Sequence, residues 1–304
     1  MQLFERVLIA VDAGSGGIDL IRYTRAIAGV MGDVMGDVEL CFVHVLGWSS
    51  QSQFRSEPTT HAQALQRLTE SVSANFGSGR TRCHVLHGDV VDSLLETAAE
   101  FAADLILVGH SREHSGRRSL ARRLAMQAPC SVWMKPAGAA ASVRRVVAAI
   151  DYSGHSAYAL SVAGHIARRA GSSTCRALHV YLNEGSAGVE EYQASDRARE
   201  REAFDRFTAP LDTAGVEVEP VLVEGVSVAE SVHRLVESEP VDLVVMGSRG
   251  QSRSVSILLG GESEGVMMES RIPVLIAKRR GERIGLLQAL LDRRFHLQEP
   301  PRFG

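Results

Sequence analysis

The feature that most constrains the fold of this chain is an internal repeat of strand-like segments. Residues 6–12 (RVLIAVD) correspond to residues 145–151 (RVVAAID), and residues 104–109 (DLILVG) correspond to residues 242–247 (DLVVMG). Further apolar runs recur in the same order in both halves. Self-similarity at a long period means that one structural unit occurs twice. Each copy spans roughly 140 residues, a usual size for a single domain.

The repeat divides the 304 residues into two domains, which we place at 1–138 and 142–280. The boundary lies in residues 136–142 (PAGAAAS), a stretch of small residues after the last strand-like run of the first copy. A third segment, 281–304, has no counterpart in the repeat. Its apolar residues share one face of a predicted helix, namely Ile284, Leu287, Leu290, Leu291 and Phe295. Such a face needs a surface to cover, either its own domain or a partner chain, and we predict a homodimer to which this helix contributes contacts.

Strand-like and helical patterns alternate within each copy. In the second copy we predict strands at 145–150, 174–181, 216–223, 243–246 and 274–277, and helices at 156–170, 189–214, 228–237 and 263–270. Apolar strands joined by helices are typical of a parallel sheet covered on both faces, so the predicted fold class is α/β. In such sheets ligands bind outside the carboxyl ends of the strands, where the strand order reverses. Asp151 and Gly247 each follow a predicted strand, so we expect them to meet at that edge.

Composition and charge exclude several functional classes. The chain is 45% hydrophobic and 23% charged with a formal net charge of −3, which gives no basic footprint for nucleic-acid binding. No apolar run is long enough to insert across a membrane, and the first predicted strand begins too early to leave room for a signal peptide. The four cysteines, Cys41, Cys83, Cys130 and Cys175, show no Cys-x-x-Cys spacing. We therefore expect buried free thiols in a reducing cytoplasm.

A glycine-rich loop follows the fourth predicted strand of the second copy. Residues 247–250 (GSRG) end this apolar run, and residues 260–263 (GGES) open the next predicted helix. Glycines allow successive backbone N–H groups to point at one ligand, and a helix N-terminus adds unpaired donors and partial positive charge. The pattern predicts a phosphate-binding loop.

With this loop, the chain resembles a tandem universal stress protein over nearly its whole length, residues 4–280. The family motif is Gly-x-x-Gly, nine residues, and then Gly followed by Ser or Thr; Gly247, Gly250 and Gly260 match it, with nine residues from 251 to 259. The resemblance implies two tandem open parallel five-stranded sheets of order 3-2-1-4-5, flanked by helices, in an adenine-nucleotide-binding, flavodoxin-like fold. It also implies that the fifth strands pair, so that residues 130–134 lie beside residues 274–278 as a pseudo-dimer.

The resemblance further implies an ATP site in the second domain. Asp151 matches a strand-end aspartate near the ribose and adenine, and Val180, after His179, matches a valine that lines the adenine pocket. The residues expected at the nucleotide are Ala149, Ile150, Asp151, Val180, Met246, Gly247, Arg249, Gly250, Gly260, Gly261, Glu262 and Ser263. No protein side chain is assigned as a metal ligand, because Mg²⁺ would be held through the phosphates.

The second copy departs from the family motif in one turn. Gly261 stands where a hydroxyl residue is usual, and Glu262 stands where a small apolar residue is usual, while Ser263 matches the second hydroxyl position. Loss of one hydroxyl donor to a phosphate costs about 1.5–3 kcal/mol. The Glu262 carboxylate would repel a phosphate unless it points outward or reaches a metal. We expect ATP binding that is weakened but retained.

The first copy departs further. Gly109 is kept, but Arg112 replaces the second glycine, and the loop that follows is six residues shorter. A loop of this length does not wrap a triphosphate, so we expect this half to be inactive as a nucleotide site. The region instead carries five arginines, Arg112, Arg117, Arg118, Arg122 and Arg123. Two interpretations remain open, a solvated helix face or a site for an anionic ligand or acidic partner.

Other polar residues have simpler interpretations. Asp12 is expected to cap the helix after the first strand, whereas Asp151, beside an intact loop, is expected to contact the ligand. His44 and His179 lie inside apolar strands and are expected to be half-buried with satisfied hydrogen bonds. The histidines of the first copy lack the spacing of a zinc site, and Ser248 and Ser263 lack a Gly-x-Ser-x-Gly elbow.

The residues and the resemblance together predict a cytoplasmic universal stress protein whose second domain binds ATP and whose first domain is structural or faces a partner. Nucleotide would order residues 247–263 and stabilise one surface for an unknown protein partner, so the chain would act as a nucleotide-responsive regulator in stress response. A slow ATPase or adenylate-transferring enzyme is an alternative, but no residue is a firm candidate for its general base. A nucleotide-free interaction scaffold is a third, favoured if Gly261 and Glu262 disable the loop.

Overall fold

The computed structural model describes residues 3–12, 14–32, 38–46, 60–77, 81–110, 119–181, 190–225, 227–249 and 259–279. The first half contains β1 (Arg6–Ala10), α1 (Ser15–Met31), β2 (Glu39–Leu46), α2 (His61–Phe76), β3 (Thr81–His87), α3 (Val90–Glu100), β4 (Leu105–His110), α4 (Leu120–Gln127) and β5 (Ser131–Pro136). The second half contains β6 (Val146–Ile150), α5 (Gly154–Arg169), β7 (Thr174–Tyr181), α6 (Glu190–Thr208), β8 (Glu217–Glu224), α7 (Val228–Ser238), β9 (Leu243–Gly247), α8 (Gly261–Glu269) and β10 (Val274–Ala277).

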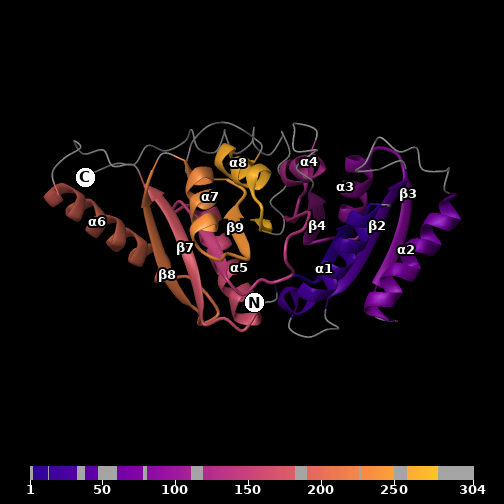
Figure 1. Ribbon diagram of the computed structural model, residues 1–304, viewed down its shortest axis with the longest axis horizontal. Helices are drawn as coiled ribbons and strands as arrows, with labels where there is room; N and C mark the ends of the chain where they lie inside the picture. The colour runs from indigo at the N-terminus through magenta and orange to yellow at the C-terminus, as the bar shows by residue number, and fades with distance from the viewer. Residues whose placement is uncertain are drawn as a thin grey trace, which may run out of the picture.

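One sheet of ten strands runs along the molecule in the order β3-β2-β1-β4-β5-β10-β9-β6-β7-β8 (Figure 1). Within each half the neighbouring strands are parallel and follow the predicted order 3-2-1-4-5. The predicted α/β fold class is therefore confirmed. The expectation of two sheets is corrected to one, because backbone hydrogen bonds join the fifth strands of the two halves.

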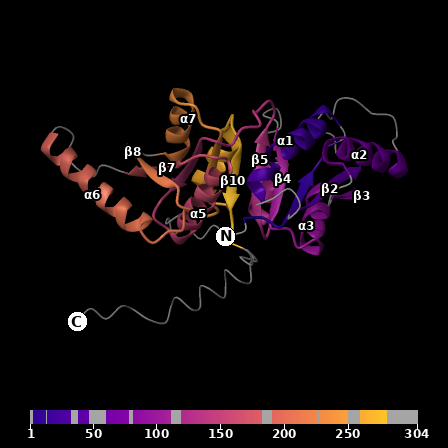
Figure 2. The same ribbon diagram turned by 90° about the horizontal axis from the view of Figure 1, so that it is seen from below.

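The junction between the halves is the antiparallel pair β5–β10, which lie side by side in Figure 2. Met134 is opposite Val274, Trp133 is opposite Leu275, and Val132 is opposite Ile276. This register confirms the predicted pseudo-dimer pairing. Each half would otherwise end in a strand with unpaired backbone groups, and the junction satisfies both of these edges within one chain.

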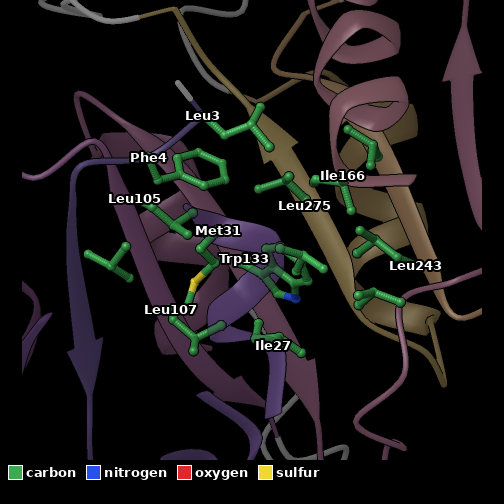
Figure 3. Packing of buried hydrophobic residues seen from close by; sticks show 14 of the residues in the cluster. Leu3, Phe4, Ile27, Met31, Leu105, Leu107, Trp133, Ile166, Leu243 and Leu275 are labelled. Carbon is green, nitrogen blue, oxygen red and sulfur yellow. The ribbon is translucent and has the colours of Figure 1, made fainter. Parts of the chain in front are cut away.

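Two hydrophobic layers, one on each face of the sheet, also cross the junction. In the layer drawn in Figure 3, Leu105 and Trp133 of the first half lie near Leu243 and Leu275 of the second. Trp133 is fully buried, and its indole Nε1 donates to the Tyr23 hydroxyl at 3.2 Å, which satisfies the polar atom of a buried tryptophan. Each of the two hydrophobic layers thus contains residues from both halves, so the halves do not pack as separate cores.

Local signals account for most element boundaries. Helix α6 ends at Thr208 and not at the predicted residue 214, because Pro210 follows and disfavours helix at the residue before it. Helix α8 begins at Gly261, two residues before the predicted start. Within the described ranges, no helix is both long enough and apolar enough to cross a membrane.

The cysteines are free thiols, as predicted, but they are not all buried. Cys41, Cys130 and Cys175 are buried, and burial raises the pKa of each thiol to about 12. Cys83 is only half-buried, which corrects the expectation for this residue. It lies on β3, which is the last strand of the sheet and has a neighbouring strand on one side only.

Candidate functional site

The carboxyl ends of β6 and β9 lie side by side in the second half. The two strands are parallel neighbours, with Ala149 opposite Met246, so Ile150 and Gly247 end at the same edge of the sheet. Helix α5 follows β6 on one face, whereas α8 packs on the other. This is the arrangement in which ligands bind α/β sheets. The structure therefore brings these predicted site residues together, while Gly250 lies outside the described residues.

Two hydrogen bonds fasten the first turn of α8 to the end of β9. The Ser263 hydroxyl donates to the Gly247 carbonyl at 3.1 Å, and the Gly260 N–H donates to the Ser248 carbonyl at 3.2 Å. Ser263 is buried, so its hydroxyl serves this internal contact. Among the described residues, no side chain caps the N-terminus of α8 at Gly260, and the N–H groups of a first helical turn lack intrahelical acceptors. The turn therefore presents backbone donors of the kind that bind phosphate.

The Glu262 carboxylate is directed at the start of α7. Its Oε2 accepts the backbone N–H groups of Val228 at 2.9 Å and Ala229 at 3.3 Å. A carboxylate at this position satisfies unpaired donors and interacts favourably with the helix dipole. The expected repulsion between Glu262 and a phosphate is thereby reduced, because the N-terminus of α7 offsets the negative charge.

Gly247 permits a close approach between β9 and α5. A Cβ atom on Gly247 would lie 2.9 Å from the His155 carbonyl carbon and 3.0 Å from the His155 Cβ. Its counterpart in the first half, Gly109, would place a Cβ within 4 Å of no described atom. The glycine at this position of the motif therefore has a packing role in the second half that the first half lacks.

Two buried polar atoms beside this turn have no hydrogen-bond partner among the described residues, namely Ser248 Oγ and Arg249 Nε. Ser248 is only 1% exposed. Buried polar groups in proteins nearly always have a partner, so each exception calls for an explanation such as a ligand or an ordered water. These atoms make the two residues after the apolar strand β9 a polar position.

Asp12 and Asp151, equivalent in the repeat, make different contacts. The Asp12 carboxylate accepts the N–H groups of Gly14 at 3.0 Å and Gly17 at 2.6 Å, which confirms its predicted role at the start of α1. At the start of α5 the cap is Ser153, whose hydroxyl accepts the N–H of Ser156 at 3.2 Å. Asp151 accepts the Ser153 N–H at 3.1 Å. The capping role has moved to Ser153, and ligand contact by Asp151 stays a prediction.

An aromatic cluster adjoins Asp151. Tyr152 has a φ of +61°, a rare conformation for an aromatic residue, and its ring centroid lies 4.1 Å from that of His179. His179 Nδ1 is 3.0 Å from the Ile150 carbonyl, and Nε2 is 3.4 Å from Glu200 of α6. Burial and the Glu200 carboxylate raise the pKa of Tyr152 well above its usual value. The contacts that Tyr152 and Glu200 make with His179 were not predicted, because no sequence pattern signals a tyrosine in the left-handed conformation.

The histidine predictions are confirmed with one difference. His179 is half-buried and hydrogen-bonded, as expected. His44 makes the equivalent contact, with Nδ1 at 2.9 Å from the Val11 carbonyl, but it is buried. Beyond His179, Val180 is half-buried at the end of β7, and a Cβ on Gly225 would lie 3.4 Å from Val180 Cγ1. This apolar corner is where the family resemblance places the adenine.

The two described members of the arginine cluster at 112–123, Arg122 and Arg123, make ion pairs within the chain. Arg122 of α4 forms a bidentate contact with Glu264 of α8, and Arg123 lies 3.7 Å from Asp89. Arg112, Arg117 and Arg118 lie outside the described residues. Arg122 is thus held by a carboxylate of the same chain, whereas Arg123, with a side chain 39% exposed, fits the solvated helix face, and an external anion or acidic partner stays a prediction. Glu264 was not singled out by the sequence, because its partner is 142 residues away.

These features define the chain as a tandem α/β protein of the flavodoxin-like class, with a glycine-rich turn after the fourth strand of its second half. The model of the universal stress protein family matches the chain twice, over residues 3–136 and 142–278. The chain therefore belongs to the universal stress protein family.

Individual relatives agree with this assignment. The universal stress protein MJ0577 of Methanocaldococcus jannaschii is 39% identical over 77 residues, which are 25% of this chain and 47% of that protein. The match thus spans about half the length of this curated relative. A universal stress protein from Archaeoglobus fulgidus DSM 4304 covers 92% of this chain and 98% of its own at 18% identity, with a TM-score of 0.62. A putative universal stress protein from Pseudomonas aeruginosa UCBPP-PA14 covers 96% and 99% at 18% identity, with a TM-score of 0.68. At these identities the two solved structures support the fold alone.

Proposed function

We propose that the second half binds ATP at the edge formed by β6, β9 and α8, and that the protein is a nucleotide-responsive regulator in stress response. The observation that carries this proposal is the first turn of α8. The Ser263–Gly247 hydrogen bond holds this turn against the end of β9, and no side chain within the described ranges caps its N-terminus. A phosphate chain there would meet backbone N–H donors and the positive end of the helix dipole.

The nucleoside would extend from this turn across the ends of β6 and β7. Asp151 would accept hydrogen bonds from ribose hydroxyls, and the half-buried Val180 would contact the base. Mg²⁺, when bound, would neutralise phosphate charge, which matters at a turn that also carries two glutamates. The cytoplasmic location, the homodimer and the protein partner remain parts of this proposal. ATP hydrolysis is not proposed as the main role.

Calorimetric titration of the full chain with ATP and Mg²⁺ tests the proposal. We expect a single site per chain, and Asp151→Ala should weaken it about tenfold through loss of a charged hydrogen-bond acceptor. Asp12→Ala is the matched control. It should leave ATP affinity unchanged while lowering the free energy of unfolding by about 1 kcal/mol, because α1 loses an N-terminal acceptor. Two sites, no site, or equal loss of affinity in both variants would contradict the proposal.

The departure at Gly261 gives a second test. A side chain at this position would meet no described atom within 4 Å of its Cβ, so Gly261→Ser adds a hydroxyl without steric conflict. If phosphates lie at this turn, the added donor should tighten ATP binding about tenfold and leave adenosine binding unchanged. Unchanged ATP affinity would place the phosphates elsewhere, and would favour the nucleotide-free scaffold if ATP also fails to bind the unmodified chain.

A further inference from the structure

The two halves meet at an ion pair on the first turn of α8. Arg122 Nε lies 2.6 Å from Glu264 Oε1, and a terminal guanidinium nitrogen lies 3.2 Å from Oε2. This is the bidentate geometry in which arginine binds carboxylates most strongly. The side chains are 21% and 32% exposed, so the pair is partly shielded from solvent. Figure 1 shows α4 and α8 next to each other at the middle of the molecule, above the sheet.

The position of Glu264 matters because the same turn is the proposed phosphate site. Glu262 and Glu264 are both in the first turn of α8, and each carboxylate would repel a bound anion. The N-terminus of α7 offsets the charge of Glu262, and Arg122 offsets that of Glu264. The Ser248 hydroxyl, only 1% exposed and with no hydrogen-bond partner among the described residues, lies beside this turn, because the Gly260 N–H donates to the Ser248 carbonyl, and it is a second polar group there that a ligand could satisfy.

We propose that Arg122, from the degenerate first half, is a positioning residue for the nucleotide site of the second half. By pairing with Glu264 it cancels a negative charge beside the phosphates and holds the carboxylate away from them. The site is then complete only when both halves are present, which gives the first half a role although its own loop is short. This inference rests on the proposed function and concerns the polyphosphate end of the ligand, not the nucleoside.

The test uses the full chain, with calorimetric titrations of MgATP and of adenosine. Arg122→Ala should lower ATP affinity about fivefold to tenfold, the effect of one uncompensated charge near the surface, and should leave adenosine affinity unchanged. The loss should shrink at high salt, because exposed charges are screened. Arg123→Ala is the matched control. It removes the same charge from the next residue of α4, whose partner is Asp89 of the first half, and should leave both affinities unchanged.

A second variant separates charge compensation from structural damage. In Arg122→Ala/Glu264→Gln the carboxylate that needs compensation is gone, so ATP affinity should return to that of the unmodified chain. Glu264→Gln alone should bind ATP as well as or better than the unmodified chain. The inference is overturned if Arg122→Ala binds ATP normally, if the double variant stays as weak as Arg122→Ala, or if Glu264→Gln weakens ATP. If the unmodified chain binds neither adenosine nor ATP, the proposed function itself fails.

Discussion

Replacing Gly247 by alanine tests whether the second half requires a glycine for packing at the end of β9. An added Cβ would lie 2.9 Å from the carbonyl carbon, 3.0 Å from the Cβ and 3.1 Å from the carbonyl oxygen of His155. Atoms of a helix backbone do not move aside by a change of rotamer, so β9 or the first turn of α5 has to shift. Overpacking of this kind costs about 1–3 kcal/mol.

The matched control is Gly109→Ala, at the equivalent position of the first half. Its Cβ would meet no described atom within 4 Å, so no clash is expected. Alanine also restricts the unfolded chain, which stabilises a compatible site by about 0.4–1 kcal/mol. The same substitution at these two equivalent positions should therefore destabilise the chain at Gly247 and leave it unchanged or slightly stabilised at Gly109.

Thermal and urea unfolding of the full chain measure the difference. At roughly 2–4 °C per kcal/mol for units of this size, Gly247→Ala should lower the melting temperature by several degrees, whereas Gly109→Ala should leave it unchanged or slightly raised. Equal effects of the two substitutions would refute the argument, because among the described residues only Gly247, and not Gly109, has a helix backbone within 3 Å of its added Cβ. An unchanged melting temperature for Gly247→Ala would show that β9 and α5 have room to separate.

Three further predictions concern the halves, their junction and assembly. Asp242 accepts the N–H groups of Arg144 and Arg145 at 3.0 Å, and although burial raises its pKa, hydrogen bonds from Arg145 produce a net lowering. A carboxyl group with a lowered pKa stabilises the fold at pH values above its unfolded-state pKa of about 3.9, and this stabilisation is lost as the pH falls through its folded-state pKa. Asp242→Asn should therefore lower the free energy of unfolding by about 2 kcal/mol at pH 7, measured by denaturant unfolding. A stability difference between the two proteins that persists below the folded-state pKa would contradict this prediction. The buried Lys278 Nζ donates to the carbonyls of Ala125 and Ala128 at 2.7 and 2.8 Å. Lys278→Met removes these donors and should destabilise the chain by about 2–3 kcal/mol in thermal unfolding. An unchanged melting temperature would show that water replaces the lost donors. Light scattering of the full chain and of a chain ending at residue 280 tests the predicted homodimer, which is wrong if both are monomers or equally stable dimers.

Much of the fold could be predicted from the sequence, because burial leaves a local pattern along the chain. The strands β7 and β10 were predicted with the bounds that the structure shows; the apolar run of β10 is buried throughout, as in a strand covered on both faces, whereas β7 also carries half-buried polar residues. The repeat showed that one unit occurs twice, and the resemblance supplied the order of strands and their pairing. The turn 260–263 and the strand-end Asp151 were expected at one edge of the sheet, and the neighbouring ends of β6 and β9 agree with this placement, while ligand binding there stays a prediction.

The contacts that tune the candidate site depend on the tertiary structure. Glu262 interacts with α7, Arg122 crosses to Glu264 of the other half, and Tyr152 takes a left-handed conformation against His179. The repeat pattern does not predict any of these contacts, because each joins segments that lie apart in the sequence. Hydrophobic periodicity records which residues are buried, but the direction of a charged side chain depends on which helix ends dock beside it. The sequence therefore determined the architecture and predicted the place of the candidate site, whereas the packing of α4, α7 and α8 decided which partners the charged side chains beside it contact.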